Sequence, residues 1–303
     1  MFRKYHLDLD PYSLSPSSAT KESHVGQNGG ERYVSSSAIA DNTIFWHVYS
    51  SIRWDNVTRG RQGANLVNVD RDPETGTEYV PIVRTTTAYH EQMQHFSVPV
   101  DYIQKCINAK VAADSSGDAT PMSFNNVMAE VYTDECRNMK FHSDQALDLD
   151  PETYIAVFSC YDDPSAPPRA LRIIHKDSDP EDPQSYQDIS MDHQSVIVFS
   201  VETNKFYRHK IIQETSETGS RWLGLTFRCS ATFVYRADGS ASEHTAHTRF
   251  RDTGKLLELA DKEKKQKFIR YKGRENREAF EYPSGICYTL SPHDFWPPIN
   301  PPG

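Results

Sequence analysis

The residues best suited to chemistry in this sequence are a histidine and an aspartate two positions apart, His142 and Asp144. In a β-strand, residues i and i+2 point to the same face, so the pair can offer an imidazole nitrogen and a carboxylate oxygen to one ion. A mononuclear Fe(II) centre with open positions for a cosubstrate and oxygen takes two histidines and one carboxylate. His209, in the stretch KFYRHKI, is the candidate second histidine. The pattern predicts an iron site made of these three side chains, which would also be the catalytic centre.

The His-x-Asp spacing occurs three times in the chain, so the spacing alone does not select a site. The other two pairs are His6 with Asp8, in a segment without hydrophobic periodicity, and His175 with Asp177, at the head of a polar run. Only the middle pair lies between segments of alternating apolar residues, which are typical of strands in a core. Each histidine could instead be an ordinary surface or hydrogen-bonded core residue. The residues downstream distinguish these alternatives.

Two arginines, Arg221 and Arg228, follow His209 in the stretch RWLGLTFR. A guanidinium is a planar, permanently charged group that binds a carboxylate through two parallel hydrogen bonds. A strand that follows the second metal histidine can therefore anchor a dicarboxylate cosubstrate close to the iron. The alternative is that both arginines are surface charges of a strand.

This ordered set of motifs resembles the AlkB-like family of Fe(II)- and 2-oxoglutarate-dependent dioxygenases. The family has an Asn-rich strand that ends in a tyrosine ahead of the metal histidine, and FNNVMAEVY ends at Tyr132, ten residues before His142. The resemblance covers roughly residues 120–235. It implies that Arg228, Arg221 and Tyr132 bind 2-oxoglutarate, although Tyr132 could equally be a core aromatic residue.

The chain departs from the family pattern at two places. Glu130 stands where the family has an asparagine, and Gly224 replaces the asparagine of the closing motif. Six residues, rather than the family's five, separate Arg221 from Arg228. A β-bulge at Gly224 or the residue before it would return both arginines to one face. Without a bulge, Trp222 takes the place of the first arginine.

The resemblance implies oxidative demethylation of an N-alkylated base in nucleic acid, a repair-type reaction that uses Fe(II), 2-oxoglutarate and O2. Such a base must be single-stranded or flipped out of its stack to enter a pocket. Two other classes stay open. The first is a hydroxylase of a protein side chain or a small molecule, which the acidic sequence pI of about 5.7 favours slightly. The second is a non-catalytic jelly-roll binding protein, which Glu130 and the arginine spacing would allow.

The segments around these motifs indicate the fold that positions them. They are rich in β-branched and aromatic residues and are separated by short turns, which predicts an all-β core with flanking helices. The architecture expected is a double-stranded β-helix, a cupin-like jelly roll. Val100, Ile103 and Ile107 recur at helical spacing after Pro99, so an amphipathic helix is expected there. Residues 256–280 predict a second helix, rich in Lys and Arg.

Composition and position divide the chain into four parts. Residues 1–40 are predicted to be a flexible arm, 41–120 a substrate-recognition lid with its supporting helix, 121–250 the jelly-roll dioxygenase core, and 251–303 a C-terminal helix with a proline-rich tail. Within the lid, five residues are candidates for substrate contact: Trp54, Arg59, Arg61, Gln62 and Tyr79. The alternative for this segment is an ordinary surface loop with a buried tryptophan.

Length and charge limit the classes of protein that remain. No apolar run approaches the roughly 18 residues needed to span a bilayer, and no signal peptide is evident, so a monomeric protein of the cytoplasm or nucleus is expected, without membrane contact. The five cysteines are scattered without CxxC spacing, in keeping with a reducing compartment. The net charge of −9 argues against a nonspecific coat of nucleic acid. Two basic stretches, around Arg59, Arg61 and Arg84 and from Lys262 to Arg277, could still contact a strand locally.

Overall fold

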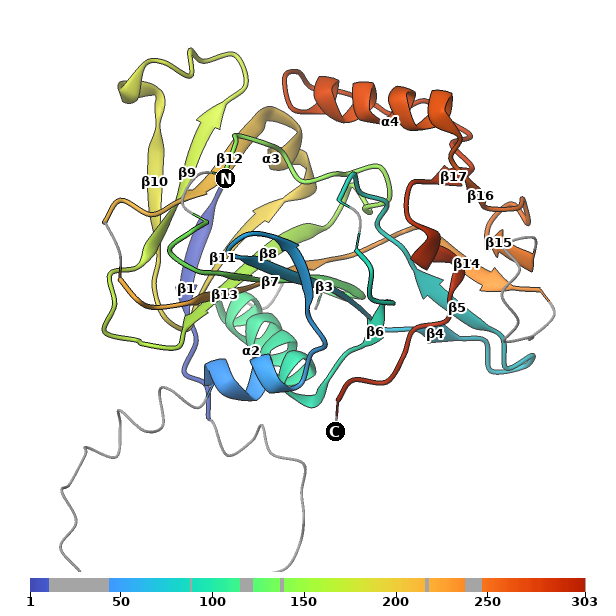
Figure 1. Cartoon of the computed structure of the whole chain (residues 1–303), viewed down its shortest axis with the longest axis horizontal. Coiled ribbons are helices and arrows are strands. Elements are labelled where there is room, and N and C mark those ends of the chain that lie inside the picture. The colour runs from blue at the N-terminus through green and yellow to red at the C-terminus, as the bar shows by residue number, and fades with distance from the viewer. Residues whose placement is uncertain are drawn as a thin grey trace, which may run out of the picture.

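Two facing sheets form the centre of the molecule (Figure 1). The larger has eight strands: Arg3–His6 (β1), Asp55–Thr58 (β2), Arg61–Val67 (β3), Gln94–His95 (β6), Asn126–Tyr132 (β7), Tyr154–Tyr161 (β8), Ser195–Ser200 (β11) and Trp222–Arg228 (β13). The smaller has three: Arg169–His175 (β9), Gln187–Met191 (β10) and Tyr207–Ile212 (β12). The orders are β1-β11-β8-β13-β7-β3-β2, with β6 beside β3, and β10-β9-β12. This computed structural model describes residues 1–10, 44–87, 89–114, 122–136, 139–215, 218–237 and 247–302.

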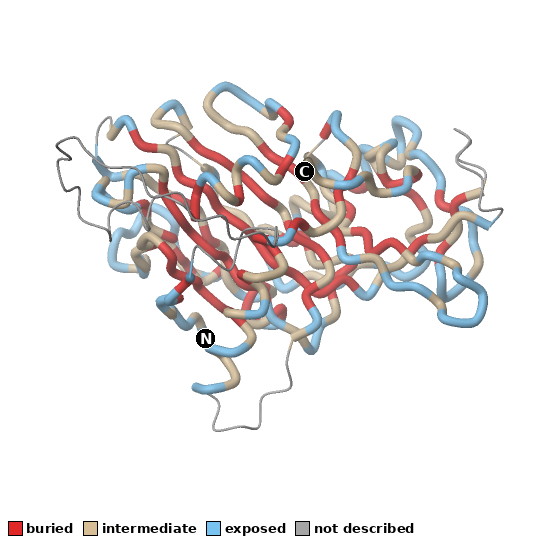
Figure 2. Tube along the Cα trace, turned by 90° about the horizontal axis from the view of Figure 1, so that it is seen from below, coloured by how far each residue is buried: buried red, intermediate tan, exposed pale blue. Residues whose placement is uncertain are grey.

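The central strands of the larger sheet are covered on both faces, and their sequences are apolar at nearly every position for that reason. One face, which includes Val131 and Leu225, packs against a helix at residues 44–50 and against Val98–Asp114 (α2). The other face, which includes Trp222, packs against the smaller sheet. Figure 2 shows the resulting arrangement, with buried segments along the strands and exposed segments at the loops. The predicted jelly-roll core with flanking helices is confirmed.

The amphipathic helix expected after Pro99 is α2, in which Val100, Ile103 and Ile107 are fully buried against the larger sheet. The helix at residues 44–50 and α2 lie together below that sheet in Figure 1. Their shared core therefore covers the outer face of the larger sheet. The inner face, which is turned toward the smaller sheet, remains available for a site.

The N-terminal boundaries differ from those expected. The flexible arm predicted for 1–40 is wrong for β1, which pairs with β11 along its whole length. The interpretation of this segment as aperiodic is also wrong, because Tyr5, Leu7 and Leu9 alternate and pack against one core cluster, with Leu7 and Leu9 buried just after β1. Residues 11–43 lie outside the described part of the chain. In the segment expected to be a lid, β2 and β3 extend the larger sheet beyond β7.

A third sheet joins two strands from residues 70–81 to two strands from the C-terminal part. A four-stranded sheet has the order β15-β14-β5-β4 and is formed by Asp70–Arg71 (β4), Glu78–Pro81 (β5), Phe233–Arg236 (β14) and Thr248–Phe250 (β15). The two remaining short strands, Glu258–Leu259 (β16) and Tyr288–Thr289 (β17), pair in parallel. The predicted basic helix is Lys262–Glu275 (α4), capped by Asp261 and buried at Phe268. None of the described helices combines the length and the apolar character needed to cross a bilayer.

Candidate metal centre

The structure brings His142, Asp144 and His209 together between the two sheets. Residue 142 lies beside β12 rather than in a full strand, and a single bridge joins it to His209. Its N–H donates to the carbonyl of His209 at 3.0 Å, and the N–H of His209 donates back at 2.7 Å. The imidazole centroids are 4.6 Å apart, and His209 Nε2 lies 3.6 Å from Asp144 Oδ1. One ligand atom from each residue lies within 4.8 Å of the others, which fits a single ion.

The protonation states of these groups suit a cation. Burial is the largest cause that lowers the pKa of His142, to about 3, and the neighbouring His209 adds to it, so the His142 ring is neutral near pH 7. Its Nδ1 lies 3.1 Å from the carbonyl of Lys140, so a proton on Nδ1 donates there and leaves the Nε2 lone pair for metal. Burial opposes ionisation of Asp144, yet His209 and the positive charge of Arg228 hold the pKa of its carboxyl well below the usual range.

The three side chains of the triad offer ligands that fit a bound metal cation. Asp144 Oδ2 is buried without a hydrogen-bond partner among the described residues. A buried carboxylate oxygen without a partner is costly, and a bound cation would satisfy it. Two imidazoles and one carboxylate are the ligands typical of Fe(II) sites with open coordination positions. His142, Asp144 and His209 therefore meet the requirements of an iron centre.

A buried arginine lies close to this triad. Arg228, at the end of β13, is 2% exposed, and its Nε has no hydrogen-bond partner in the described part of the chain. The described residues contribute no carboxylate ion pair to it, although its charge acts on Asp144. Asn126, directly opposite on β7, also has a buried side-chain oxygen that no described residue hydrogen-bonds. Because buried charges are normally paired, the region around Arg228 and Asn126 is suited to bind a carboxylate of a small molecule.

Arg221, in contrast, is directed away from the triad. Strand β13 pairs with β7 without a register shift from Trp222 to Arg228, so the bulge that would realign the arginines is not formed. Arg221 and Arg228 are an odd number of positions apart, which places them on opposite faces of an unbulged strand. The Arg221 guanidinium binds Asp162 at 2.7 Å. It lies 4.7–5.1 Å from three ring centroids, those of Phe45, Trp46 and Tyr49. The structure does not place Arg221 where the prediction requires it.

Trp222 occupies the position that the first arginine would have taken. Its indole folds over Gly224, where an added Cβ would overlap the ring, and it packs against Tyr132 at a centroid distance of 4.9 Å. The Tyr132 hydroxyl donates to Glu130 Oε2 at 2.9 Å, and Glu130 Oε1 accepts from Arg61 Nε at 2.8 Å. Tyr132 therefore lies on the inner face as expected, but its hydroxyl is bonded to Glu130.

Sequence reasoning missed Tyr89. This residue is 5% exposed, and its hydroxyl has no hydrogen-bond partner among the described residues. Its ring fills the space beside Gly63, where a Cβ would lie 2.8 Å from Tyr89 Cε1. Burial and the charge of Glu130 raise its pKa, while Arg61 and Arg228 act in the opposite direction. Tyr89 follows an irregular stretch, TTTA, so no periodicity in the sequence indicates that its ring enters the site.

Of the five candidates for substrate contact, only Arg61 lies on the sheet face that carries Tyr132. Trp54 stacks on Tyr49 and donates to its carbonyl at 2.8 Å. Gln62 accepts from the Tyr49 hydroxyl at 3.2 Å. The other two are at the periphery: Arg59 is bound to Glu135, and Tyr79 lies under Arg251 in the four-stranded sheet.

Comparison with known proteins agrees with the donor set. Residues 50–228 match the model of the 2OG-Fe(II) oxygenase superfamily. The chain belongs to this superfamily. As a 2OG-Fe(II) oxygenase it is an oxidoreductase whose cofactor is Fe(II) and whose cosubstrates are 2-oxoglutarate and O2. A comparison with curated protein sequences gives no match.

Two solved structures are similar to this oxygenase. One is a structure of OsALKBH1, with 16% identity over 56% of this chain and 78% of that chain and a TM-score of 0.35. The other is a crystal structure of a Pseudomonas putida prolyl-4-hydroxylase, with 12% identity over 76% of this chain and 93% of that chain and a TM-score of 0.37. Both scores are too low to bear on the substrate of the present oxygenase.

Proposed function

We propose that this oxygenase is AlkB-like and removes the alkyl group from an N-alkylated base of nucleic acid, presented as a single strand or as a flipped base. The motifs from Tyr132 to Arg228 support the proposal by their resemblance to that family. The observation that carries it is the charge of α4, a basic helix on the surface of a chain whose net charge is −9.

Helix α4 offers cations that no protein carboxylate neutralises. Within the described residues, five exposed side chains in and just after the helix take part in no ion pair: Lys262, Lys265, Lys267, Arg270 and Arg277. The end of the helix contacts the loop that carries Asp144, through a hydrogen bond from Ser143 to Asn276. Exposed cations without an ion-pair partner among the described residues, on a helix whose end contacts the metal loop, are suited to bind the phosphates that flank a target base.

The second basic stretch expected from the sequence is already neutralised. Arg59 is paired with Glu135, and Arg61 with Glu130. Arg84 is 4% exposed, and its guanidinium binds Asp148, with the closest contact at 2.6 Å. Phosphate contact is therefore proposed for α4 alone.

The residues of the chain have separate tasks in this proposal. His142, Asp144 and His209 would hold Fe(II), and Arg228 would bind a carboxylate of 2-oxoglutarate. When bound, iron, 2-oxoglutarate and O2 supply hydroxylation of a C–H bond, and a hydroxylated N-alkyl carbon leaves its base as an aldehyde. The apolar residues of the inner face exclude water from the reacting centre.

The test is succinate release by the full chain with Fe(II) and 2-oxoglutarate. Matched single-stranded oligonucleotides, with and without N-methylated bases, are compared with a panel of peptides and small amines. Only the methylated oligonucleotides are expected to stimulate release. Binding to them should fall with salt, with a log-log slope of about −0.7 for each phosphate neutralised.

Charge variants connect this salt dependence to α4. Lys267→Gln with Arg270→Gln removes two unpaired cations three positions apart on one helix face, and should flatten the slope by up to about 1.4. Lys264→Gln with Arg274→Gln is the matched control, because these cations are already paired with carboxylates. Salt-independent turnover of a peptide or an amine would replace the proposal by a general hydroxylase. No succinate with any substrate would favour the non-catalytic binding protein.

A further inference from the structure

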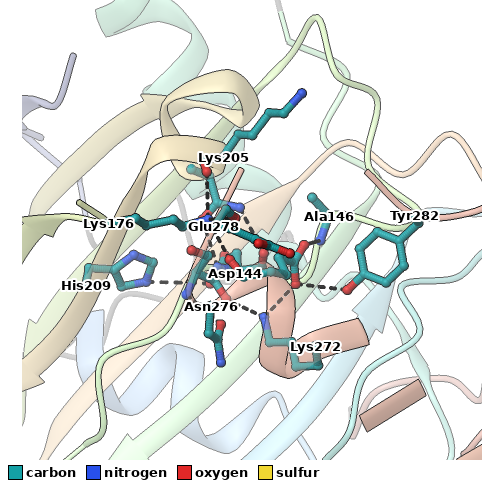
Figure 3. A network of polar contacts seen from close by, with 12 residues as sticks. Asp144, Ala146, Lys176, Lys205, His209, Lys272, Asn276, Glu278 and Tyr282 are labelled. Atoms are coloured by element: carbon teal, nitrogen blue, oxygen red, sulfur yellow. Dashed lines mark hydrogen bonds and ion pairs between the residues drawn. The ribbon is translucent and has the colours of Figure 1, made fainter. Parts of the chain in front are cut away.

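The backbone of the loop that carries Asp144 is hydrogen-bonded mainly by side chains of helices (Figure 3), and the Ser143 hydroxyl adds one bond to strand β12, donated to the Tyr207 carbonyl at 2.8 Å. Residues 143–146 follow the single bridge at His142 and belong to no strand. A buried backbone group without a partner costs roughly 1–3 kcal/mol, so the partners of this loop determine its path. Those partners come from Val201–Phe206 (α3) and from the C-terminal end of α4, which is 133 residues further along the chain.

Ser143, between the two ligands, is bound by α4 at both of its peptide groups. Its N–H donates to Asn276 Oδ1 at 3.0 Å, and its carbonyl accepts from Lys272 Nζ. Ser143 is completely buried, so water does not replace these bonds. Lys272 and Asn276 therefore orient the two peptide groups of the residue that is covalently bonded to both metal ligands, while its hydroxyl is held by β12.

The next residues of the loop are held in the same way. The N–H of Asp144 donates to Asn204 Oδ1, and its carbonyl accepts from Asn204 Nδ2, both at 2.8 Å. The N–H of Ala146 donates to Glu275 Oε1 at 2.9 Å. Helix α3 thus fixes the peptide groups of the ligand itself, and α4 fixes those on either side of it.

Glu275 is in turn held in place by its own partners. It is 4% exposed, and its Oε2 accepts from Lys272 Nζ and from the Tyr282 hydroxyl, both at 2.9 Å. Lys176 Nζ donates to the carbonyls of Glu275 and Lys205, both at 2.6 Å, and so ties the ends of α4 and α3 together. Figure 3 shows Lys176, Lys272 and Tyr282 arranged around Asp144.

We propose that Asn276, Lys272 and Glu275 are positioning residues of the metal centre. They act through the backbone of the loop and direct the imidazole of His142 and the carboxylate of Asp144 toward one point. The match to the oxygenase superfamily ends at residue 228, so α4 lies outside the matched part of the chain. The inference rests on the metal centre of the proposed function. Groups that hydrogen-bond directly to metal ligands typically contribute 10- to 100-fold to metal affinity, and we expect a comparable contribution through the loop backbone.

The experiment measures metal binding without turnover. Metal-free full chain is titrated with Co(II), and visible absorption reports affinity and ligand geometry. Asn276→Ala removes the acceptor for Ser143 and should weaken Co(II) binding by about 10- to 100-fold, with an altered absorption band. Asn276→Asp keeps an oxygen acceptor and should restore both. Gln266→Ala, which removes an exposed amide from the same helix, is the matched control and should change neither.

Two further measurements make the outcome unambiguous. Urea unfolding of the metal-free variants reports folding separately from binding. The positioning role is refuted if Asn276→Ala and Lys272→Met lower stability while the folded protein binds Co(II) with unchanged affinity. His209→Ala tests the centre itself: if this variant binds Co(II) like the unchanged protein, the triad is not the metal site and the proposed function fails with it.

Discussion

Replacing Arg228 by methionine should weaken the oxygenase as a catalyst while making the empty protein more stable. The side chain is 2% exposed, and among the described residues its Nε has no hydrogen-bond partner and no carboxylate forms an ion pair with it, so the cost of its desolvation is not offset there. Replacing a buried ion pair by apolar residues of similar volume is often neutral or stabilising by about 1–4 kcal/mol, because the burial of charge is costly. Part of this gain is lost because Arg228 also stabilises the charge of Asp144. We expect Arg228→Met to raise the free energy of unfolding by about 1 kcal/mol.

Binding of the cosubstrate should change in the opposite direction. Loss of a buried, hydrogen-bonded charge pair costs on the order of 2–5 kcal/mol, much of it from the carboxylate left unpaired. At about 1.4 kcal/mol per factor of ten, this is a loss of roughly 30-fold to several thousand-fold in affinity for 2-oxoglutarate. Calorimetric titration with 2-oxoglutarate in the presence of Mn(II) measures the affinity, and urea unfolding of the metal-free protein measures stability.

Arg221→Met is the matched control for this pair of measurements. Arg221 has an ion-pair partner in Asp162 and aromatic neighbours, so its loss should lower stability by about 1 kcal/mol. Its side chain lies on the face of the sheet that packs on Phe45, opposite to the face that carries Arg228, which predicts an unchanged affinity for 2-oxoglutarate. The reasoning is wrong if Arg228→Met destabilises the empty protein as Arg221→Met does, or if the two variants bind 2-oxoglutarate equally well.

Three other predictions follow from particular contacts. Gly224→Ala should destabilise the protein by about 1–3 kcal/mol in urea unfolding, because the new Cβ overlaps the ring of Trp222, and Trp222→Leu in the same chain should recover part of the loss. Burial raises the pKa of Asp294 to about 7, so the folded state keeps a proton that the unfolded state loses, and thermal stability should fall as the pH rises from about 4 to 7. Asp294→Asn should remove this dependence, and an unchanged pH profile would assign it to another group. His209→Ala should abolish succinate release without unfolding, by circular dichroism; retained activity would exclude His209 as a ligand.

The parts of the site that sequence reasoning identified carry short motifs between apolar, alternating segments. The spacing of His142 and Asp144, followed by His209, indicated the metal triad, although the strand expected at the pair is not formed: residues 143–146 are a loop, and the loop rather than strand geometry brings the two ligands together. The jelly-roll core was predicted from alternation and strand composition. These inferences need no knowledge of distant contacts.

Two kinds of feature were beyond the sequence. Whether Arg221 joins Arg228 depended on a bulge, and a bulge has no sequence signature strong enough to choose between the two registers. The bonds from Asn276 and Glu275 to the metal loop join segments that are more than a hundred residues apart, through side chains on a helix whose pattern resembles an ordinary solvated helix. Only the folded chain shows that the end of this helix supports the metal ligands.

Strand β1 has a consequence for solubility. It covers the edge of β11, whose sequence SVIVFS is short, apolar and β-branched, the composition that pairs readily with other chains when its edge is free. Arg3 and Lys4 place positive charge along the new outer edge and pair with Asp114 and Asp192. A chain that lacks its first eight residues would keep every metal ligand, yet it would expose a hydrophobic edge and should aggregate at concentrations at which the full chain stays dispersed.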